Sequence, residues 1–500
     1  MKKVYVVGFD AMIMPLVKRF AREGVLPNFS RMMQRGATNE VIPSFPPWTP
    51  TNWATLITGA DTGSHGVAGW YVKTPDGKQV SAFDSRAVKA ETIFEVADRN
   101  GIRSVAFHYP ATMPARVKDG YVVDGFGHPG RNSPYQVAPS RGYTTVAGVP
   151  DSDIISFQPA ADGWTNVPIS RGKPLAARIE VRKHAQESNA VVLWLLLLDN
   201  AGKGYDTIAV CAQPDGQSEI CRASAGEWTK WVHIQVGGAK GMVRFKPLQI
   251  SRDGSVVKLY RSQVTPLDGF TYPDELGKHL IDKFGPYLEH ASHHTYTASI
   301  GDFATALEEA DYQAQWIAKA GVHMMNQKGC RLFYCHWHWL DHVSHIHLSG
   351  IDPVSPLFSV DEMERHLHCL RQSYAAADRM IGTILSSIDE DTYVLAISDH
   401  GNAPDVRVID IQRFLWQKGY LVLKDPSREG NRSTTWEDID WQRTTAYQDP
   451  GMPSFNIWIN AEPGSKRYRE IQMDLVHDLR TWVDPVINRT PIALALSKEA

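Results

Sequence analysis

Hydrophobic and polar residues follow two distinct patterns along this chain. Near the N-terminus, a continuous apolar run at 4–9 is followed by amphipathic stretches at 12–24 and 28–36. The continuous run is typical of a strand buried on both faces of a parallel sheet, whereas the amphipathic stretches predict helices. Gly24 marks the end of the first helix, and an apolar run at 104–109 predicts a further strand.

Residues from about 150 to 265 show the second pattern, in which short β-rich runs are separated by turn signals. The turn signals include DNAGKG, PDGQ, GGAKG and RDG. Regular short strands between such turns predict an antiparallel, sandwich-like unit. The longest apolar run, at 190–198, is too short to span a bilayer, so it is interpreted as a core strand.

Alternation of helices and strands returns after about residue 300. Helices are predicted at 303–327, 361–388 and 408–418, and strands at 331–337 and 392–398. Because parallel-sheet patterning stands on both sides of a β-rich stretch, the sequence predicts an α/β fold. The predicted fold has a mostly parallel central sheet flanked by helices, with an inserted antiparallel β-rich domain. The predicted boundaries are 1–150 for the first part of the α/β domain, 151–265 for the insertion and 266–500 for the second part.

The composition is that of an ordinary globular protein and does not by itself indicate a function. The chain has 500 residues, more than one core usually holds, and its 43% hydrophobic and 21% charged residues are ordinary for a globular protein. A net charge of -3 gives no global argument for nucleic acid or an anionic membrane as a partner. MKKVYVVGFD begins like a secretion signal, but Asp10 interrupts it and no small-residue cleavage site follows.

The five cysteines indicate a reducing compartment. They are few, odd in number and lack a CxxC pair, so they do not suggest a disulfide framework. The sequence therefore favours the cytoplasm, although Cys211 and Cys221 could still pair as a local hairpin bridge.

Polar residues with metal-ligating side chains follow three of the predicted strands. Asp10 follows the first strand, Asp341 and His345 follow the strand at 331–337, and Asp399 and His400 follow the strand at 392–398. In an open parallel sheet, binding sites gather at the carboxyl ends of the strands. Each of these signals alone has a plain structural explanation as a helix cap, a surface pair or a turn. Together they supply carboxylates and imidazoles, the ligand types that Zn²⁺ and Mn²⁺ take.

The stretch SFPPWTPTNWATLITG (44–59) places a hydroxyl at the start of a helix. Thr49 is a favoured N-cap, Pro50 a favoured first helical residue, and Gly59 ends the helix. A helix N-terminus also suits a phosphate, and a hydroxyl beside a metal becomes a nucleophile. The residues alone leave both roles of Thr49 open.

These stretches together resemble a known family. The resemblance rests on Asp10 after its strand, LPNFSRMMQRGA, PPWTPTNWATLITG, GSHGVAGW, the Asp341–His345 pair and SDHG. In this order they are similar to the alkaline phosphatase superfamily, and most to its branch of type I phosphodiesterases and nucleotide pyrophosphatases. The resemblance covers about 1–130 and 300–460, and 150–265 lies outside it.

The resemblance implies a catalytic α/β domain that uses two divalent metal ions, with Zn²⁺ as the first choice and Mn²⁺ as the alternative. It implies that Thr49 attacks phosphorus and forms a covalent phospho-threonine, while Asn52 hydrogen-bonds a phosphate oxygen. Asp10, Asp399 and His400 would hold the metal that activates Thr49.

The second metal would be held by Asp341 and His345 and would activate water for hydrolysis of the intermediate. The family adds a histidine from near the C-terminal end, and this chain departs from that pattern. After His400 the only histidine is His477, inside a predicted amphipathic helix. The candidates for the missing ligand are Asp449, His336, His338 and His342.

The favoured function is hydrolysis of phosphodiesters, because Thr49 and Asn52 match that branch. A phosphomonoesterase on the same centre is the alternative. A sulfatase would need a cysteine-type nucleophile at position 49, and a phosphomutase would normally use serine. A hypothesis from another class is a metal-stabilised binding protein with a degenerate site. The expected partner is a small-molecule phosphate ester, with no nucleic acid and no membrane, and a homo-oligomer is left open.

Overall fold

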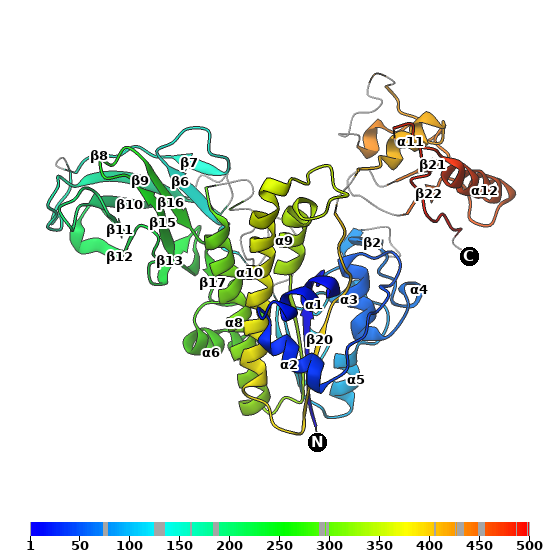
Figure 1. Cartoon of the computed structure of the whole chain (residues 1–500), viewed down its shortest axis with the longest axis horizontal. Coiled ribbons are helices and arrows are strands. Elements are labelled where there is room, and N and C mark those ends of the chain that lie inside the picture. Colours follow the sequence, from blue (N-terminus) through cyan, green and yellow to red (C-terminus); the bar gives the residue numbers. More distant parts are fainter. Residues whose placement is uncertain are drawn as a thin grey trace. The chain divides into compact units, whose positions relative to one another are not determined.

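The structure is a computed structural model of the whole chain. It describes residues 2–73, 79–124, 136–160, 163–183, 190–289, 296, 300–404, 407–425, 427, 435–448, 456–486, 488–497 and 499. The chain clusters into two compact units, Met1–Pro404 and Asp405–Ala500, and each is described by itself (Figure 1).

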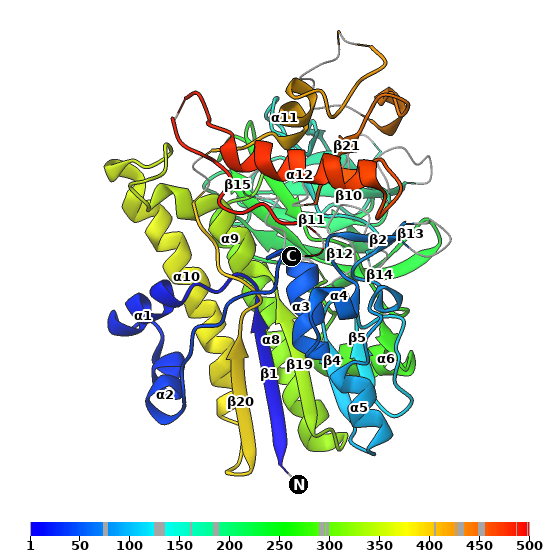
Figure 2. The same ribbon diagram turned by 90° about the vertical axis from the view of Figure 1, so that its right-hand side faces the viewer.

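The first unit is built around a six-stranded sheet with the order β18-β5-β4-β19-β1-β20 (Figure 2). Its strands are β1 (Lys3–Phe9), β4 (Ser104–Phe107), β5 (Tyr121–Val123), β18 (Thr271–Tyr272), β19 (Leu332–Trp337) and β20 (Thr392–Ile397). All neighbours are parallel except β18, which is antiparallel to β5. The largely parallel sheet confirms the predicted α/β class, and the four strands predicted for it are present.

Helices cover both faces of this sheet. One face carries α1 (Met14–Arg22), α2 (Pro27–Arg35), α8 (Phe303–Gln327) and α10 (Val360–Leu385), whose apolar side chains share a core with Val7 and Phe333 of the sheet. The other face carries α3 (Thr49–Thr58) and α5 (Ile93–Arg99), which pack against Ala106 and Tyr334. Neighbouring strand residues point to opposite faces, so continuous apolar runs were the correct signal for a sheet buried on both sides.

The register of the central strands brings the predicted polar residues to one level. Gly8 lies opposite Ile397, and Phe9 lies opposite Trp337. The residues that follow, Asp10, His338 and Asp399, therefore leave three adjacent strands at the same edge. This arrangement follows from parallel pairing and creates the site described below.

Between Arg141 and Pro266 the first unit is β-rich. Its strands are β6 (Arg141–Thr144), β7 (Ser152–Ile154), β8 (Gln158–Pro159), β9 (Leu175–Val181), β10 (Val191–Leu198), β11 (Thr207–Cys211), β12 (Glu219–Ser224), β13 (Val232–Val236), β14 (Ala239–Val243), β15 (Phe245–Ile250), β16 (Val257–Arg261) and β17 (Thr265–Pro266). They form three sheets, antiparallel except for the β6–β7 pair, around a shared apolar core. Cys211 and Cys221 are buried and free, so the predicted alternative of a hairpin bridge between them is wrong.

The second unit is small and mixed. It contains α11 (Ile411–Gln417), β21 (Ala446–Tyr447), β22 (Trp458–Ile459) and α12 (Lys466–Thr481), which surround an apolar core of their own. The predicted helix at 408–418 corresponds to α11. The three-part division of the chain into 1–150, 151–265 and 266–500 stays a prediction. In the described ranges, no helix combines the length and apolar character needed to cross a membrane.

Candidate active site

Three of the predicted ligands, Asp10, Asp399 and His400, lie together at the carboxyl edge of the sheet. His400 Nε2 lies 3.4 Å from Asp10 Oδ1 and 3.3 Å from Asp399 Oδ2. The Asp10 and Asp399 side chains are fully buried, and these same two oxygens have no hydrogen-bond partner among the described residues. Buried carboxylate oxygens without donors are costly, and a bound cation would satisfy them. The three ligand atoms lie within 4.8 Å of one another, so the set fits a divalent metal.

The two buried carboxyl groups have opposite pKa shifts. Burial disfavours the charged form of Asp10, but the charge of His338 and the hydrogen bonds of His336 and His338 outweigh it and hold its pKa well below the ordinary value. Burial and the nearby charge of Asp10 raise the pKa of Asp399 well above the ordinary value. Two adjacent buried carboxylates therefore resist being charged together unless positive charge stands between them.

Thr49 reaches this cluster from the N-terminus of α3. Its hydroxyl oxygen lies 3.1 Å from His400 Nε2. The helix has Trp48 as its N-cap residue, no side chain caps it, and Thr49 and Pro50 are its first two residues. The prediction that Thr49 caps the helix is therefore wrong. That prediction rested on threonine as a favoured N-cap type and proline as a favoured first helical residue, whereas here proline is the second residue of the helix. The predicted end at Gly59 is confirmed by its left-handed backbone, with φ 65°.

Gly8 of β1, which has no side chain, lets α3 lie close against the sheet. A Cβ atom on Gly8 would stand 2.6 Å from the Trp53 ring and 2.8 Å from the Cys335 carbonyl oxygen. Trp53 is fully buried, and its indole N–H donates to Asp10 Oδ2 over 3.4 Å. The sequence analysis did not identify Trp53 as a partner of a metal ligand. Its position four residues after Thr49, on the same helix face, was the signal available.

Asn52 is held by the segment that precedes its helix. Its Oδ1 accepts from the Ser44 backbone N–H over 2.6 Å, and its Nδ2 donates to the Trp48 carbonyl oxygen over 3.1 Å. The Ser44 hydroxyl donates to Thr55 Oγ1 over 3.0 Å, which ties the same segment to the middle of α3. The amide nitrogen of Asn52 carries a second hydrogen, which a bound phosphate oxygen could accept.

His65, from GSHG, completes this support. Its Nδ1 accepts from the Val67 backbone N–H over 3.1 Å, so Nε2 carries the hydrogen and donates to Thr55 Oγ1 over 3.0 Å. Burial lowers the pKa of His65, which keeps the ring neutral. These contacts give His65 a structural role.

Asp341 and His345 lie on α9 (Trp339–His347), the helix that follows β19. His345 Nε2 lies 3.3 Å from Asp341 Oδ1, as expected for side chains four residues apart on one helix face. His338 Nε2 lies 3.6 Å from the other oxygen, Asp341 Oδ2. The predicted pair is thus brought together, and a further imidazole joins it.

His336 and His338 both contact Asp10. His336 Nε2 and His338 Nδ1 lie 2.8 Å and 2.6 Å from Asp10 Oδ2. Burial disfavours the charged form of both rings. In His338 the charges of Asp10 and Asp341 outweigh burial, so its pKa is raised, whereas in His336 burial prevails. Asp449, another candidate, lies outside the described residues.

His108 supports His336 from the next strand. Each ring Nδ1 lies close to the carbonyl oxygen of the other residue, at 3.0 Å for His108 Nδ1 and 3.2 Å for His336 Nδ1. His108 has φ 56°, which is uncommon for a residue with a side chain and costs free energy. The sequence analysis placed His108 inside a strand, but β4 ends at Phe107. Asp10 was identified because it directly follows a predicted strand. With the strand ending at Phe107, His108 would have been identified in the same way.

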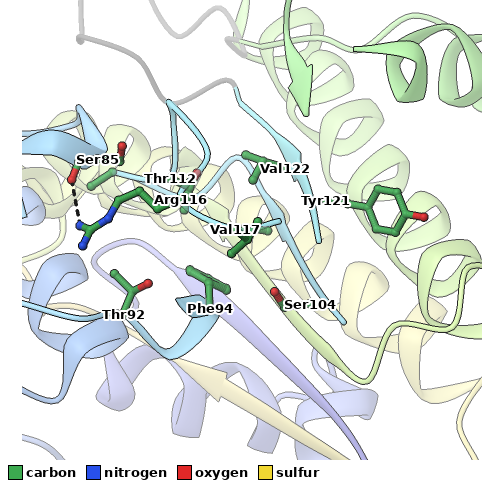
Figure 3. A pocket seen from close by; sticks show the side chains of 11 residues that line it. Ser85, Thr92, Phe94, Ser104, Thr112, Arg116, Val117, Tyr121 and Val122 are labelled. Carbon is green, nitrogen blue, oxygen red and sulfur yellow. Dashed lines mark hydrogen bonds between the residues drawn. The ribbon is translucent and has the colours of Figure 1, made fainter. Parts of the chain in front are cut away.

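A separate pocket lies beside α5, β4 and β5 and shares no lining residue with this cluster (Figure 3). Arg116, on its wall, donates to the carbonyl oxygens of Ser85 and Val88 over 3.2 Å and 2.8 Å and pairs with Glu95 at 2.9 Å. Its guanidinium is thus engaged in packing the loop. The cluster at the strand ends is therefore the candidate active site.

Comparisons with known proteins show the family to which the chain belongs. The chain matches the sequence profile of the type I phosphodiesterase / nucleotide pyrophosphatase family over residues 4–205 and 261–478. It therefore belongs to this family, within the alkaline phosphatase superfamily, and is a phosphoric ester hydrolase. The match reaches further into the β-rich region than the resemblance did and leaves out 206–260. No match was found among curated proteins.

Two solved structures match this chain in a comparison of structures. Phosphonoacetate hydrolase from Sinorhizobium meliloti 1021, in complex with phosphonoacetate, has 12% identity and a TM-score of 0.42, over 96% of this chain and 74% of that one. Murine ectonucleotide pyrophosphatase / phosphodiesterase 5, in an inactive form with AMP, has 13% identity and a TM-score of 0.35, over 85% of this chain and 64% of that one.

Proposed function

We propose that this enzyme hydrolyses phosphodiesters through a covalent phospho-threonine on Thr49. The observation that carries the proposal is the 3.1 Å contact between the Thr49 hydroxyl and His400 Nε2, inside the cluster with Asp10 and Asp399. The hydroxyl is not used as a helix cap and is held at the edge where, among the described residues, Asp10 Oδ1 and Asp399 Oδ2 have no hydrogen-bond partner. A phosphomonoesterase on the same centre is the alternative.

The reaction divides into two displacements at phosphorus. The Thr49 oxygen attacks, its proton leaves, the bond from phosphorus to the departing alkoxide breaks, and that oxygen is protonated in the product alcohol. Water then attacks the phospho-threonine, the bond from phosphorus to the Thr49 oxygen breaks, and that oxygen regains a proton. The N-terminus of α3 favours the negative phosphate through its free N–H groups and dipole, and Asn52 would donate to a phosphate oxygen.

Two divalent metal ions are proposed as cofactors, with Zn²⁺ preferred and Mn²⁺ as the alternative. Asp10, Asp399 and His400 would hold the first, and Asp341 and His345 would contribute to the second. When bound, such ions lower the pKa of a nearby hydroxyl or water and stabilise charge on the phosphoryl oxygens. Burial of Asp10 and Asp399 excludes water from the first set and strengthens its attraction for a cation.

The remaining finer proposals concern the rest of the molecule. The fold is proposed to be alkaline-phosphatase-like, with the β-rich stretch as a domain inserted into the catalytic α/β domain. A small-molecule phosphate ester is the proposed partner, and the cytoplasm is the proposed location. Family membership favours an enzyme over the alternative of a binding protein with a degenerate site.

The proposal is tested with purified protein loaded with Zn²⁺ or Mn²⁺. We expect faster hydrolysis of bis-p-nitrophenyl phosphate than of p-nitrophenyl phosphate, and loss of at least about 10³-fold in kcat for Thr49→Ala. Thr58→Ala is the matched control, because Thr58 lies at the far end of the same helix and donates to the Ala54 carbonyl oxygen. Metal-loaded wild type that is inactive on both esters would overturn the enzyme proposal. Unchanged activity of Thr49→Ala would overturn the role of Thr49, and preference for the monoester would favour the alternative.

A further inference from the structure

Asp341 is approached by imidazoles on both of its oxygens. His338 Nε2 lies 3.6 Å from Oδ2 and His345 Nε2 lies 3.3 Å from Oδ1. These separations exceed the usual length of a hydrogen bond. The two nitrogens approach different oxygens of Asp341, so they flank the carboxylate, and an ion shared by all three side chains would draw both rings toward it.

The other ring nitrogen of His338 fixes which nitrogen faces Asp341. Nδ1 lies 2.6 Å from Asp10 Oδ2, a hydrogen-bond length, and a carboxylate oxygen can only accept. Nδ1 therefore carries a hydrogen, and in the neutral ring Nε2 keeps a lone pair that faces Asp341. Metal-bound histidines are commonly held in this way, with the second nitrogen donating to a carboxylate.

We propose that His338 is the third protein ligand of the second metal, together with Asp341 and His345. It takes the place of the histidine that the family supplies from its C-terminal part. The inference rests on the proposed two-metal function and names a ligand that the family pattern does not. His336 is the less suitable neighbour, because its Nε2 serves Asp10 over 2.8 Å.

The assignment gives Asp10 a role at both metals. Its Oδ1 faces His400 Nε2 at 3.4 Å, and its Oδ2 accepts from His338 at 2.6 Å. One buried carboxylate would thus bind the first metal directly and orient a ligand of the second. The side chain of His338 is 12% exposed, against 60% for His345, so the buried histidine is the better fixed of the two.

The experiment uses the full chain, stripped by a chelator and titrated with Zn²⁺ in a calorimeter. Bound metal per chain is measured after desalting, and Co²⁺ absorption reports the coordination of the second site. The key variant is His338→Asn, whose amide can still donate to Asp10 from the Nδ1 position but lacks Nε2. We expect wild type to bind two ions, and His338→Asn to keep the first with the affinity of the second reduced by more than about 100-fold. A lost outer-shell partner alone costs about 10–100-fold.

Two further variants complete the design. His345→Ala should lose the same second ion, and Asp399→Asn should lose the first. His338→Gln, with an amide near the Nε2 position and no Nδ1 donor, should retain the second ion better than His338→Asn does. Circular dichroism of the metal-free proteins checks that all are folded.

The outcomes separate this inference from the proposed function. Wild type that binds fewer than two ions would overturn the two-metal proposal and the ligand assignment with it. Wild type with two ions and His338→Asn with both affinities within about 10-fold of it would overturn the assignment alone. Loss of both ions in His338→Asn would show that His338 acts only by positioning Asp10 and would also overturn the assignment.

Discussion

The Thr49 hydroxyl lies 3.1 Å from His400 Nε2, although the two residues are 351 positions apart in the chain. α3 brings the first residue and the end of β20 brings the second. A helix start and a strand end thus meet at one edge of the sheet. In open α/β sheets this edge is where ligands bind, so the contact links the fold directly to the proposed chemistry.

The first prediction concerns what Thr49 contributes to stability. Replacing a true threonine N-cap costs typically about 1 kcal/mol, but here no side chain caps the helix. We therefore expect Thr49→Val to cost the metal-free protein only the contact with His400, about 1 kcal/mol in the free energy of unfolding, and to cost nothing further in a His400→Ala background. Urea unfolding measures it, and kcat should fall as in Thr49→Ala. A stability loss near 1 kcal/mol that persists in the His400→Ala background would return Thr49 to the role of a cap.

Much of the site could be predicted because parallel strands share one carboxyl edge. Asp10, Asp399 and His400 follow strands whose apolar runs are unambiguous, and the register brings them together. The role of His338 and Trp53 around Asp10 could not be predicted in this way. It depends on side-chain directions at a strand end and across a helix–sheet contact, which periodicity does not specify. The start of α3 was misplaced by one residue, because a favoured N-cap residue type does not by itself fix where a helix begins.

The second prediction concerns metal removal. The metal-free protein keeps Asp10 Oδ1 and Asp399 Oδ2 buried without hydrogen-bond donors among the described residues. Zn²⁺ binding should therefore stabilise it, by about 2.7 kcal/mol when free metal is 100 times its dissociation constant. Thermal unfolding with and without chelator measures the gain.

The matched variant for this prediction is Asp399→Asn. An amide removes the unfavourable proximity of two buried carboxyl groups, so the metal-free variant should be at least as stable as the metal-free wild type. It should gain little from Zn²⁺. A variant that is clearly less stable without metal would contradict the view that Asp399 is held in place for a cation.

The third prediction concerns the packing of α3 on β1. A Cβ on Gly8 would lie 2.6 Å from Trp53 and 2.8 Å from the Cys335 carbonyl oxygen, and the backbone atom cannot move aside easily. Gly8→Ala should lower the free energy of unfolding by about 1–3 kcal/mol, the usual cost of overpacking. The substitution should also reduce kcat, because a shift of Trp53 would move α3, the helix that carries Thr49. Gly69→Ala is the control, since a Cβ there meets nothing within 4 Å. Equal stability of the two variants would show that the contact is not tight.

The fourth prediction concerns a histidine pair away from the site, between α6 (Glu275–Phe284) and α8. His279 Nε2 and His323 Nε2 are 2.9 Å apart, so one ring can donate to the other only while the acceptor is neutral. Burial and the charges of Lys283 and Lys328 lower the pKa of both rings, and His279 also lowers that of His323. The nearby carboxylate of Asp282 opposes this shift for His279.

The sign of the pH effect follows from these shifts. The unfolded chain takes up protons near the ordinary imidazole value of about 6.5, whereas the folded rings do so at lower pH. The contribution to stability is therefore complete above about pH 6.5 and is lost as the pH falls through the folded pKa values. Since both rings are partly exposed, the loss should stay below about 1 kcal/mol.

His323→Gln tests this expectation in protein stripped of metal by a chelator, so that metal binding does not contribute to the measured stability. Urea unfolding at pH values of about 7.5, 6.5 and 5.5 should show a smaller fall in stability for the variant than for the wild type. His368→Gln is a suitable control, because His368 lies on α10 away from this pair. A fall that is equally steep in wild type and His323→Gln would mean that the pair does not sense pH in this range, and that the acid sensitivity of the first unit arises elsewhere.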